Sequence, residues 1–178
     1  MVSVLSSWQP GTWVLCYQLS TDGLLAAAQH DQCDSQGPTI TLVKSTQGFV
    51  FGGYASQPFL SGGVAIEDPN AYLFTLSNPS SIPPTRFPIM QNSLALTDEF
   101  DKYYSWGTVE FAPVNQEVNS VPYGMVSGSS SVYDFSSVDT TTSTCTSPAL
   151  TDIFLGTPDG PEDCLISMIE IETFYYTV

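Results

Sequence analysis

Two short apolar runs separated by a turn constrain the fold of this chain more than any other feature of its sequence. The runs at 39–44 and 49–54 are rich in β-branched and aromatic residues, and the four residues between them include Gly48. They predict a β-hairpin with apolar positions at Ile40, Leu42, Val50 and Phe51. The glycine pair at 52–53 marks a close approach of another backbone or of a large ring, with Tyr54 and Phe59 as the candidate rings.

The other segments with clear periodicity are also mostly strands. Alternation of apolar and polar residues predicts strands at 13–19, 71–76 and 164–178, and weaker signals predict strands at 105–111 and 123–126. One helix is predicted at 24–31, with Asp22 as its cap, and the Ser/Thr-rich stretch 127–147 is predicted to be a surface loop. We therefore expect an α+β fold that is mainly β. We expect residues 12–178 to form a single domain, a sandwich of two antiparallel β-sheets with one or two short helices.

The charge composition excludes several classes of partner. Eighteen acidic and three basic residues among 178 give a formal net charge of −15, yet only 12% of the residues are charged. Polyanions require clustered Lys and Arg, and the three basic residues Lys44, Arg86 and Lys102 are far apart in the sequence. We expect no binding to nucleic acid and, because no stretch holds the roughly 20 apolar residues of a spanning helix, no insertion into a membrane.

The four cysteines permit disulfides but show no metal-binding spacing. Cys16, Cys33, Cys145 and Cys164 include no CxxC pair, which argues against a zinc knuckle or a thioredoxin-like motif. Cys145 and Cys164 flank a loop-rich stretch and can form a disulfide with each other. Cys16 lies within an apolar strand and is interpreted first as a buried free thiol. The pairing of the cysteines stays open at this point.

The first eleven residues form an extension that a turn separates from the domain. The run at 2–5 is apolar and β-branched, and Gln9-Pro10-Gly11 follows it. It is predicted to be a strand, either docked in its own sheet or added to the sheet edge of a neighbouring copy. In the second case the assembly contacts come from Val2, Val4 and Leu5.

A motif in the first third of the chain resembles the signature of the TLDc domain family. It has the form HxxCDxxGPTxTxxKS followed by FGGY, and its residues are His30, Cys33, Asp34, Gly37, Pro38, Thr39, Lys44, Gly52, Gly53 and Tyr54. The resemblance extends over about residues 12 to 178 and implies a compact two-sheet sandwich without enzymatic activity. Better studied intracellular members of this family bind the vacuolar proton pump and are linked to oxidative-stress resistance. The second glycine-rich motif of the family, of the form GPxFGxxHD, is absent from 103–110.

The polar residues of the motif favour structural roles over catalysis. A thiolate activated by a neighbouring histidine is conceivable for His30 and Cys33, but a helix C-terminus raises the pKa of a thiol. Asp34 is predicted to form an Asx-type turn that leads into the next strand, and Lys44 to pair with a carboxylate. No GxSxG, HExxH or phosphate-binding loop occurs. We predict no catalytic residue, no metal and no cofactor. The acidic patches at 98–101 and 159–163 offer oxygen ligands that suit calcium, and calcium binding is the weaker alternative.

These observations predict a non-enzymatic module that acts by binding, either to another protein or to copies of itself. Low charge, abundant Ser, Thr, Gly and Pro, and an even number of cysteines favour a secreted or cell-surface structural subunit that self-associates, with a filament as one outcome. The alternative, which rests on the family resemblance, is a cytoplasmic regulator that binds the vacuolar proton pump or acts in oxidative-stress resistance.

Overall fold

The computed structural model of the chain describes residues 2–91, 95–98, 102–107, 112–118, 121–125, 133–134 and 165–177. The helices in these ranges are α1 (Val2–Trp8), α2 (Leu19–Asp22) and α3 (Ala26–Cys33). The strands are β1 (Thr12–Gln18), β2 (Thr39–Ser45), β3 (Val50–Ala55), β4 (Val64–Ile66), β5 (Tyr72–Ser77), β6 (Thr85–Pro88), β7 (Leu96–Asp98), β8 (Ser105–Trp106), β9 (Ala112–Val118), β10 (Val121–Met125) and β11 (Leu165–Thr177). None of the described helices is long and apolar enough to cross a membrane.

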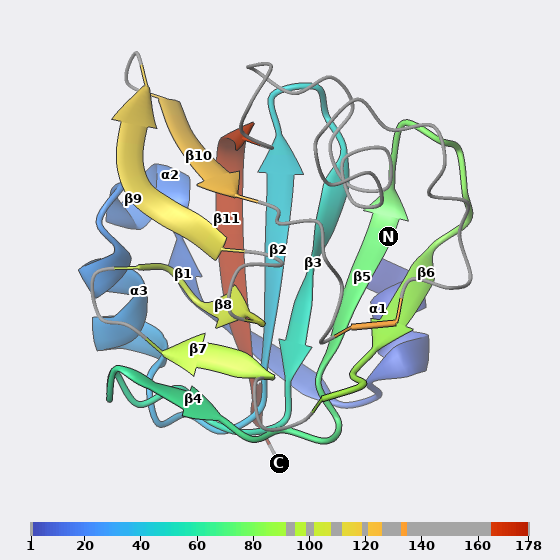
Figure 1. Cartoon of the computed structure of the whole chain (residues 1–178), viewed down its shortest axis with the longest axis horizontal. Helices are drawn as coiled ribbons and strands as arrows, with labels where there is room; N and C mark the ends of the chain where they lie inside the picture. The colour runs from blue at the N-terminus through green and yellow to red at the C-terminus, as the bar shows by residue number, and fades with distance from the viewer. Residues whose placement is uncertain are drawn as a thin grey trace.

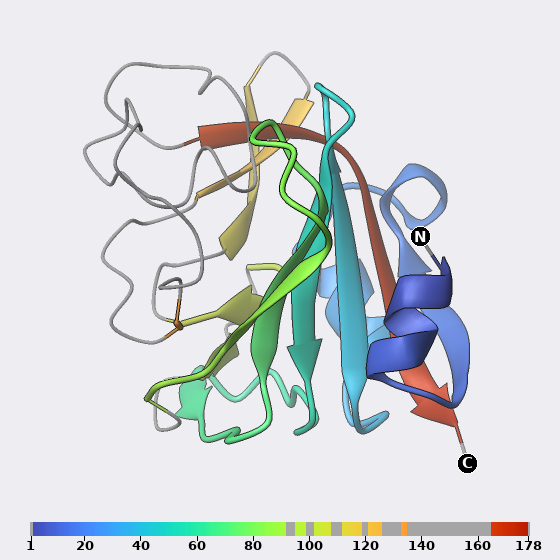
Figure 2. The same cartoon turned by 90° about the vertical axis from the view of Figure 1, so that its right-hand side faces the viewer.

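Two antiparallel sheets form the fold, as the sequence predicted. The larger sheet has the order β6-β5-β3-β2-β11-β10-β9, and β1 also pairs with β11 (Figure 1). The smaller sheet has the order β4-β7-β8 and lies against one face of the larger sheet, which we call the inner face (Figure 2). Helix α1 lies on the opposite, outer face. The larger sheet therefore has an apolar layer on each side.

The predicted hairpin is confirmed as β2 and β3, the centre of the larger sheet. Its register pairs Ile40 with Tyr54 and Lys44 with Val50. A Cβ atom at Gly53 would collide with the indole of Trp106, so the ring at the glycine pair is Trp106 and not Tyr54 or Phe59. The ring that needs this space comes from β8, about 50 residues later in the chain, and no local pattern could have indicated it.

Each face of the larger sheet covers its own apolar cluster. The inner cluster lies between the two sheets and includes the fully buried Phe51, Leu73, Trp106 and Ile171. The outer cluster consists of Ile40, Val50, Tyr54, Tyr72, Phe74 and Leu76. Alternate residues of each strand point to opposite faces, so the strands of this sheet supply apolar residues to both clusters.

The strand prediction at 2–5 is wrong, because these residues begin helix α1. Val4, Leu5 and Trp8 lie on one face of this helix and pack against the outer cluster. Arg86 of β6 lies 5.4 Å from the ring centroid of Trp8 and makes a cation–π contact that helps to hold the helix. Three apolar residues in so short a run fit a strand or a helix equally well, and packing against the apolar outer face favours the amphipathic helix.

The predicted helix at 24–31 is found as α3, displaced by two residues, and a second short helix that was not predicted precedes it. The chain forms the short helix α2, breaks at Gly23 with φ 95°, and starts α3 at Ala26 without a side-chain cap. The Asp22 carboxylate accepts a hydrogen bond from the Gln18 backbone N–H at 2.7 Å, so it satisfies the start of α2 instead of capping α3. The strands predicted at 13–19, 71–76 and 164–178 are confirmed as β1, β5 and β11. The predicted loop at 127–147 lies outside the described residues except for Tyr133 and Asp134.

Candidate functional site

A disulfide fixes the end of the helix that carries the family motif. Cys16 of β1 is bonded to Cys33 in the last turn of α3, with a sequence separation of 17. The interpretation of Cys16 as a free thiol is therefore wrong, because α3 packs alongside β1 and brings the second sulfur to it. The bond also removes the thiol that a His–Cys mechanism would need. Cys145 and Cys164 lie outside the described residues.

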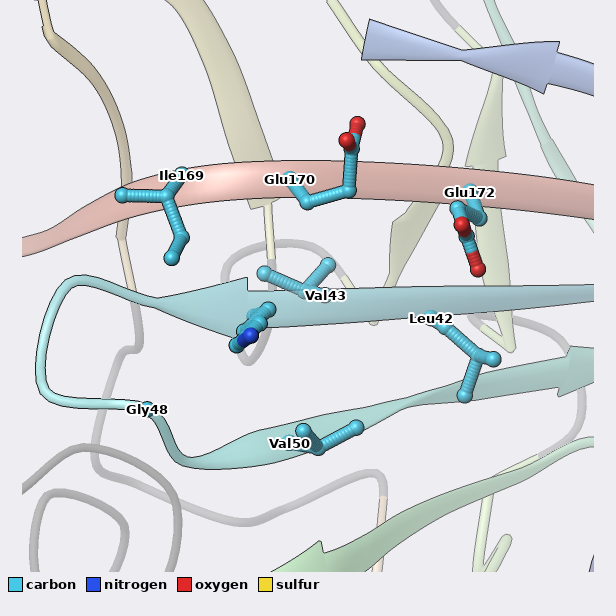
Figure 3. A pocket seen from close by; sticks show the side chains of 8 residues that line it. Leu42, Val43, Gly48, Val50, Ile169, Glu170 and Glu172 are labelled. Atoms are coloured by element: carbon cyan, nitrogen blue, oxygen red, sulfur yellow. The ribbon is translucent and has the colours of Figure 1, made fainter. Parts of the chain in front are cut away.

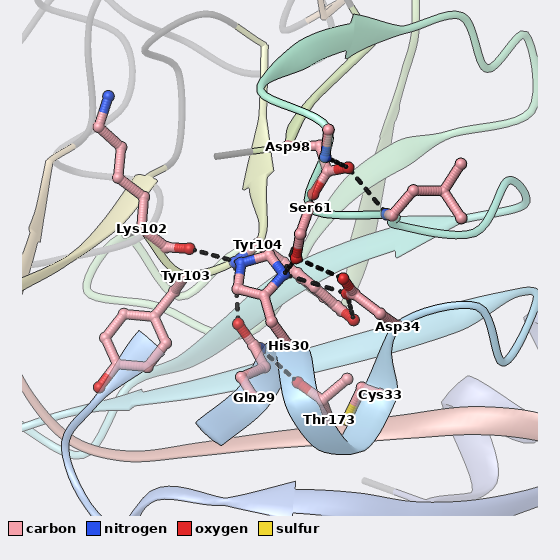
Figure 4. A network of polar contacts seen from close by, with 12 residues as sticks. Gln29, His30, Cys33, Asp34, Ser61, Asp98, Lys102, Tyr103, Tyr104 and Thr173 are labelled. Atoms are coloured by element: carbon pink, nitrogen blue, oxygen red, sulfur yellow. Dashed lines mark hydrogen bonds and ion pairs between the residues drawn. The ribbon is translucent and has the colours of Figure 1, made fainter. Parts of the chain in front are cut away.

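His30 is the centre of a buried polar network that links three segments of the chain (Figure 4). Its Nε2 lies 2.9 Å from the Lys102 carbonyl oxygen. A carbonyl only accepts hydrogen bonds, so Nε2 carries a hydrogen. Its Nδ1 lies 3.0 Å from Oδ1 of Asp34 and 2.9 Å from Oγ of Ser61. The imidazole is thus held at both nitrogens, with Nδ1 facing the acidic side of the network.

Asp34 follows α3 and is bound by side chains. Its Oδ1 accepts a hydrogen bond from the Tyr104 hydroxyl at 2.7 Å, and its Oδ2 accepts one from the Ser61 hydroxyl at 2.5 Å. The Asx-turn interpretation of Asp34 is wrong, because its partners are side chains from distant segments and not the backbone that follows it. The Tyr104 ring also stacks on Phe59 with ring centroids 3.7 Å apart.

Asp98, at the end of β7, is the second carboxylate of the network. Its Oδ2 accepts hydrogen bonds from the backbone N–H groups of Leu60 and Gly62 at 2.8 and 3.0 Å. Its Oδ1 is buried without a hydrogen-bond partner and lies 3.9 Å from Nδ1 of His30. From the sequence, Asp98 was only part of an acidic patch that could bind calcium, whereas its side chain is 0% exposed.

The two carboxylates favour the charged form of His30. Burial works to lower its pKa, but the hydrogen bond with Asp34, the contact with the Lys102 carbonyl and the nearby Asp34 and Asp98 charges raise it above the ordinary value. Burial alone would raise the pKa of Asp34, yet hydrogen bonds from His30, Ser61 and Tyr104 lower it. The network therefore favours a positively charged imidazolium beside a negatively charged Asp34 carboxylate.

The remaining motif residues position the hairpin. The Pro38 carbonyl accepts the Tyr176 N–H at 3.0 Å, and Thr39 begins β2 beside β11, so the Gly37-Pro38-Thr39 turn attaches the hairpin to the last strand. Tyr54 stacks on Tyr72 in the outer cluster. Among the described residues no carboxylate lies within 4.0 Å of the Lys44 amine, so the ion pair predicted for Lys44 is absent from this part of the chain.

The outer face also carries an open groove, which is lined by residues of the larger sheet and of the turn after β2. The groove has a volume of about 560 Å³ and runs between β2, β3 and β11 (Figure 3). Its apolar lining residues are Leu42, Val43, Val50 and Ile169, and Ile169 is 48% exposed. Lys44, Glu170 and Glu172 line the same groove. Leu42 also lines a smaller hollow of about 190 Å³ between α1 and the sheet.

The sequence indicated only part of these two sites. It singled out His30 and Asp34, but it missed Ser61 and Tyr104, which complete the network. Ser61 adopts a positive φ of 55°, a conformation that no feature of its neighbours predicts. Tyr104 lies in the region where the family's second motif is absent. The groove was missed because its three strands are brought together only by sheet pairing.

The fold and the His30 network define a two-sheet domain with a histidine–carboxylate network between α3, the Ser61 loop and β7. A sequence model of the family described as TLDc domain matches residues 2–152. The match covers well over half of the chain, and this protein therefore belongs to the TLDc family. No curated protein matches the chain.

Proposed function

We propose that this protein is a non-enzymatic TLDc module that acts by binding, as a secreted or cell-surface structural subunit that self-associates. The groove on the outer face carries this proposal, because it combines apolar side chains with charges of both signs. Two features support a non-enzymatic role. Cys33 is held in a disulfide, and both ring nitrogens of His30 are engaged inside the protein.

The charges around the groove suit contact with a second copy of the same surface. Glu170 and Glu172 lie on β11, and burial together with the negative charge of Glu170 raises the pKa of Glu172. Across the groove, Lys44 has no carboxylate within ion-pair distance among the described residues. In a two-fold contact, Lys44 of one copy would face Glu172 of the other, while Leu42 and Ile169 would be buried between them.

This geometry favours a closed dimer as the unit of assembly. A two-fold contact uses the same patch on both copies and is complete with two of them. A filament would need a second, different contact; of the predicted assembly residues Val2, Val4 and Leu5, the last two pack against the outer cluster of their own chain, so α1 would have to leave the sheet to supply it. Strand exchange by this segment is no longer part of the proposal, because the segment is helical.

The disulfide supports the proposed location. Bonds such as Cys16–Cys33 form and persist in oxidising compartments and are rare in the cytosol. We therefore propose an extracellular or cell-surface location.

The proposal is tested by measuring the mass of the full chain in solution. We expect light scattering after size-exclusion chromatography to give a dimer or a larger species, and Ile169→Asp to shift it to monomer. Leu25→Asp is the matched control, since Leu25 is 62% exposed and lies outside the groove. Lys44→Glu should weaken association, and adding Glu172→Lys should restore it. A wild-type protein that stays monomeric at all concentrations would overturn self-association.

Membership in the TLDc family favours one second candidate, an intracellular regulator that binds the vacuolar proton pump. Retention of purified pump subunits by the immobilised protein at physiological salt would support this candidate. A protein that forms no oligomer and does retain the pump would replace the structural proposal by the regulatory one.

A further inference from the structure

We propose that His30, Asp34 and Asp98 form a binding site for a divalent transition-metal cation of the zinc class. The candidate ligand atoms, His30 Nδ1 and one carboxylate oxygen from each aspartate, all lie within 4.8 Å of one another. They come from α3, from the residue that follows it and from β7, and Figure 4 shows them facing a common point. This site is independent of the groove on the outer face.

The unpartnered oxygen of Asp98 is the observation that points to a ligand. The Asp98 side chain is 0% exposed, and its Oδ1 has no hydrogen-bond partner. A buried polar atom without a partner is rare because it loses its hydration without compensation. This oxygen lies 3.9 Å from Nδ1 of His30. A cation between the two aspartates would use the oxygen that the protein itself leaves unpaired.

The spacing of the ligand atoms fits a small tetrahedral ion. Zinc binds nitrogen and carboxylate oxygen at about 2.0–2.2 Å, which places neighbouring ligand atoms about 3.4 Å apart. The separations from Nδ1 are 3.0 Å to Oδ1 of Asp34 and 3.9 Å to Oδ1 of Asp98, on either side of that value. All three candidate atoms lie within 4.8 Å of one another, so the two carboxylates would have to move toward the ion to complete the site.

The hydrogen-bond partners of the three candidate ligand residues are arranged as they are in known metal sites. A metal-bound histidine commonly donates its other N–H to a carbonyl or carboxylate, and Nε2 of His30 meets the Lys102 carbonyl at 2.9 Å. The second oxygen of Asp98 accepts two backbone N–H groups, and Asp34 accepts the Tyr104 hydroxyl. These contacts fix all three ligands before any ion arrives.

The donor set selects the class of cation. One imidazole nitrogen and two carboxylates suit zinc and neighbouring transition metals, whereas calcium takes six to eight oxygen ligands. Ser61 Oγ, 2.9 Å from Nδ1, is placed to supply the fourth ligand. With its hydrogen on Nε2, the neutral imidazole offers the lone pair of Nδ1 to the ion, and a proton bound at Nδ1 would pass to solvent. Access is from the side of Asp34, whose side chain is 17% exposed.

The test uses the full chain, freed of metal by dialysis against a chelator. Titration calorimetry with ZnCl₂ should give one saturable site, and CaCl₂ should neither bind there nor compete. Asp98→Asn is the decisive variant, because the amide oxygen still accepts the Leu60 and Gly62 N–H groups while the NH₂ group cannot bind metal. We expect at least about a tenfold loss of zinc affinity in this variant.

Asp31→Asn is the matched control, since Asp31 is exposed on the same helix. It should bind zinc as the wild type does, and circular dichroism should show that both variants are folded. Cobalt gives a second readout, since Co²⁺ in a tetrahedral site absorbs visible light strongly and loosely held aqueous Co²⁺ does not. The proposal is overturned if the wild type shows no saturable zinc site, or if folded Asp98→Asn binds zinc as tightly as the wild type.

Discussion

At the scale of single residues, Gly53 shows how the centre of the fold depends on the absence of a side chain. The Trp106 indole lies where a Cβ atom of residue 53 would be, and its Nε1 donates a hydrogen bond to the Tyr54 carbonyl at 3.1 Å. The indole also meets Phe59 edge-on and is fully buried. This ring therefore joins the small sheet to the large one only because position 53 has no side chain.

We predict that Gly53→Ala destabilises the protein by about 1–3 kcal/mol, since the added methyl group must displace a buried ring. The measurement is the free energy of unfolding from urea titration. Gly62→Ala is the matched control, because its added Cβ would meet only Val64 Cγ2 at an ordinary 3.5 Å. Equal stability of the two variants would show that the Trp106 contact with Gly53 is not required.

At the scale of secondary-structure elements, helix α3, in which the family motif begins, is held in place by a disulfide and by side-chain hydrogen bonds. The Cys16–Cys33 disulfide joins the helix to β1, and Gln29 donates a hydrogen bond to Thr173 of β11 at 2.7 Å. The His30 network then attaches the same helix to the Ser61 loop and to β7. Helix α3 is short and has no side-chain cap at its start, so these tertiary contacts must supply its stability.

We predict that Cys16→Ala combined with Cys33→Ala lowers the free energy of unfolding by about 3 kcal/mol, the effect expected for a loop of this length. For a chain of this size, that loss corresponds to a decrease of about 6–12 °C in Tm. Thermal unfolding followed by circular dichroism measures the change. A double variant with the Tm of the wild type would show that the bond does not stabilise the domain.

At the scale of the whole molecule, the formal net charge of −15 acts on stability and not on the choice of fold. Eighteen carboxylates are brought closer together by folding, with only three basic residues to offset them. Self-repulsion of this kind destabilises the compact state and is screened by salt.

We therefore predict that raising NaCl from about 10 mM to about 0.5 M at pH 7 increases the free energy of unfolding by on the order of 1 kcal/mol. The same change of salt near pH 4, where Asp and Glu side chains titrate, should have little effect. Urea unfolding at the two pH values makes the comparison. A loss of stability with salt at pH 7 would mean that specific ion pairs outweigh the general repulsion.

The sequence alone determined the features that depend on residues close together in the chain. Alternation of apolar residues predicted β1, β5 and β11, and the turn between two such runs predicted the central hairpin. From these signals and from the motif at 30–54 followed the mainly β fold and membership in the TLDc family. Side-chain periodicity is a property of the strand itself, so it can be recognised before the partners of the strand are known.

Only the tertiary structure decided what depends on segments far apart in the sequence. It made residues 2–8 a helix, because the outer face of the sheet offered apolar side chains for packing. It joined Cys16 to Cys33, and it buried Asp98 beside His30, 68 positions earlier in the chain. Burial and long-range contact change the charge state and the partners of a side chain, and the local sequence carries no record of either.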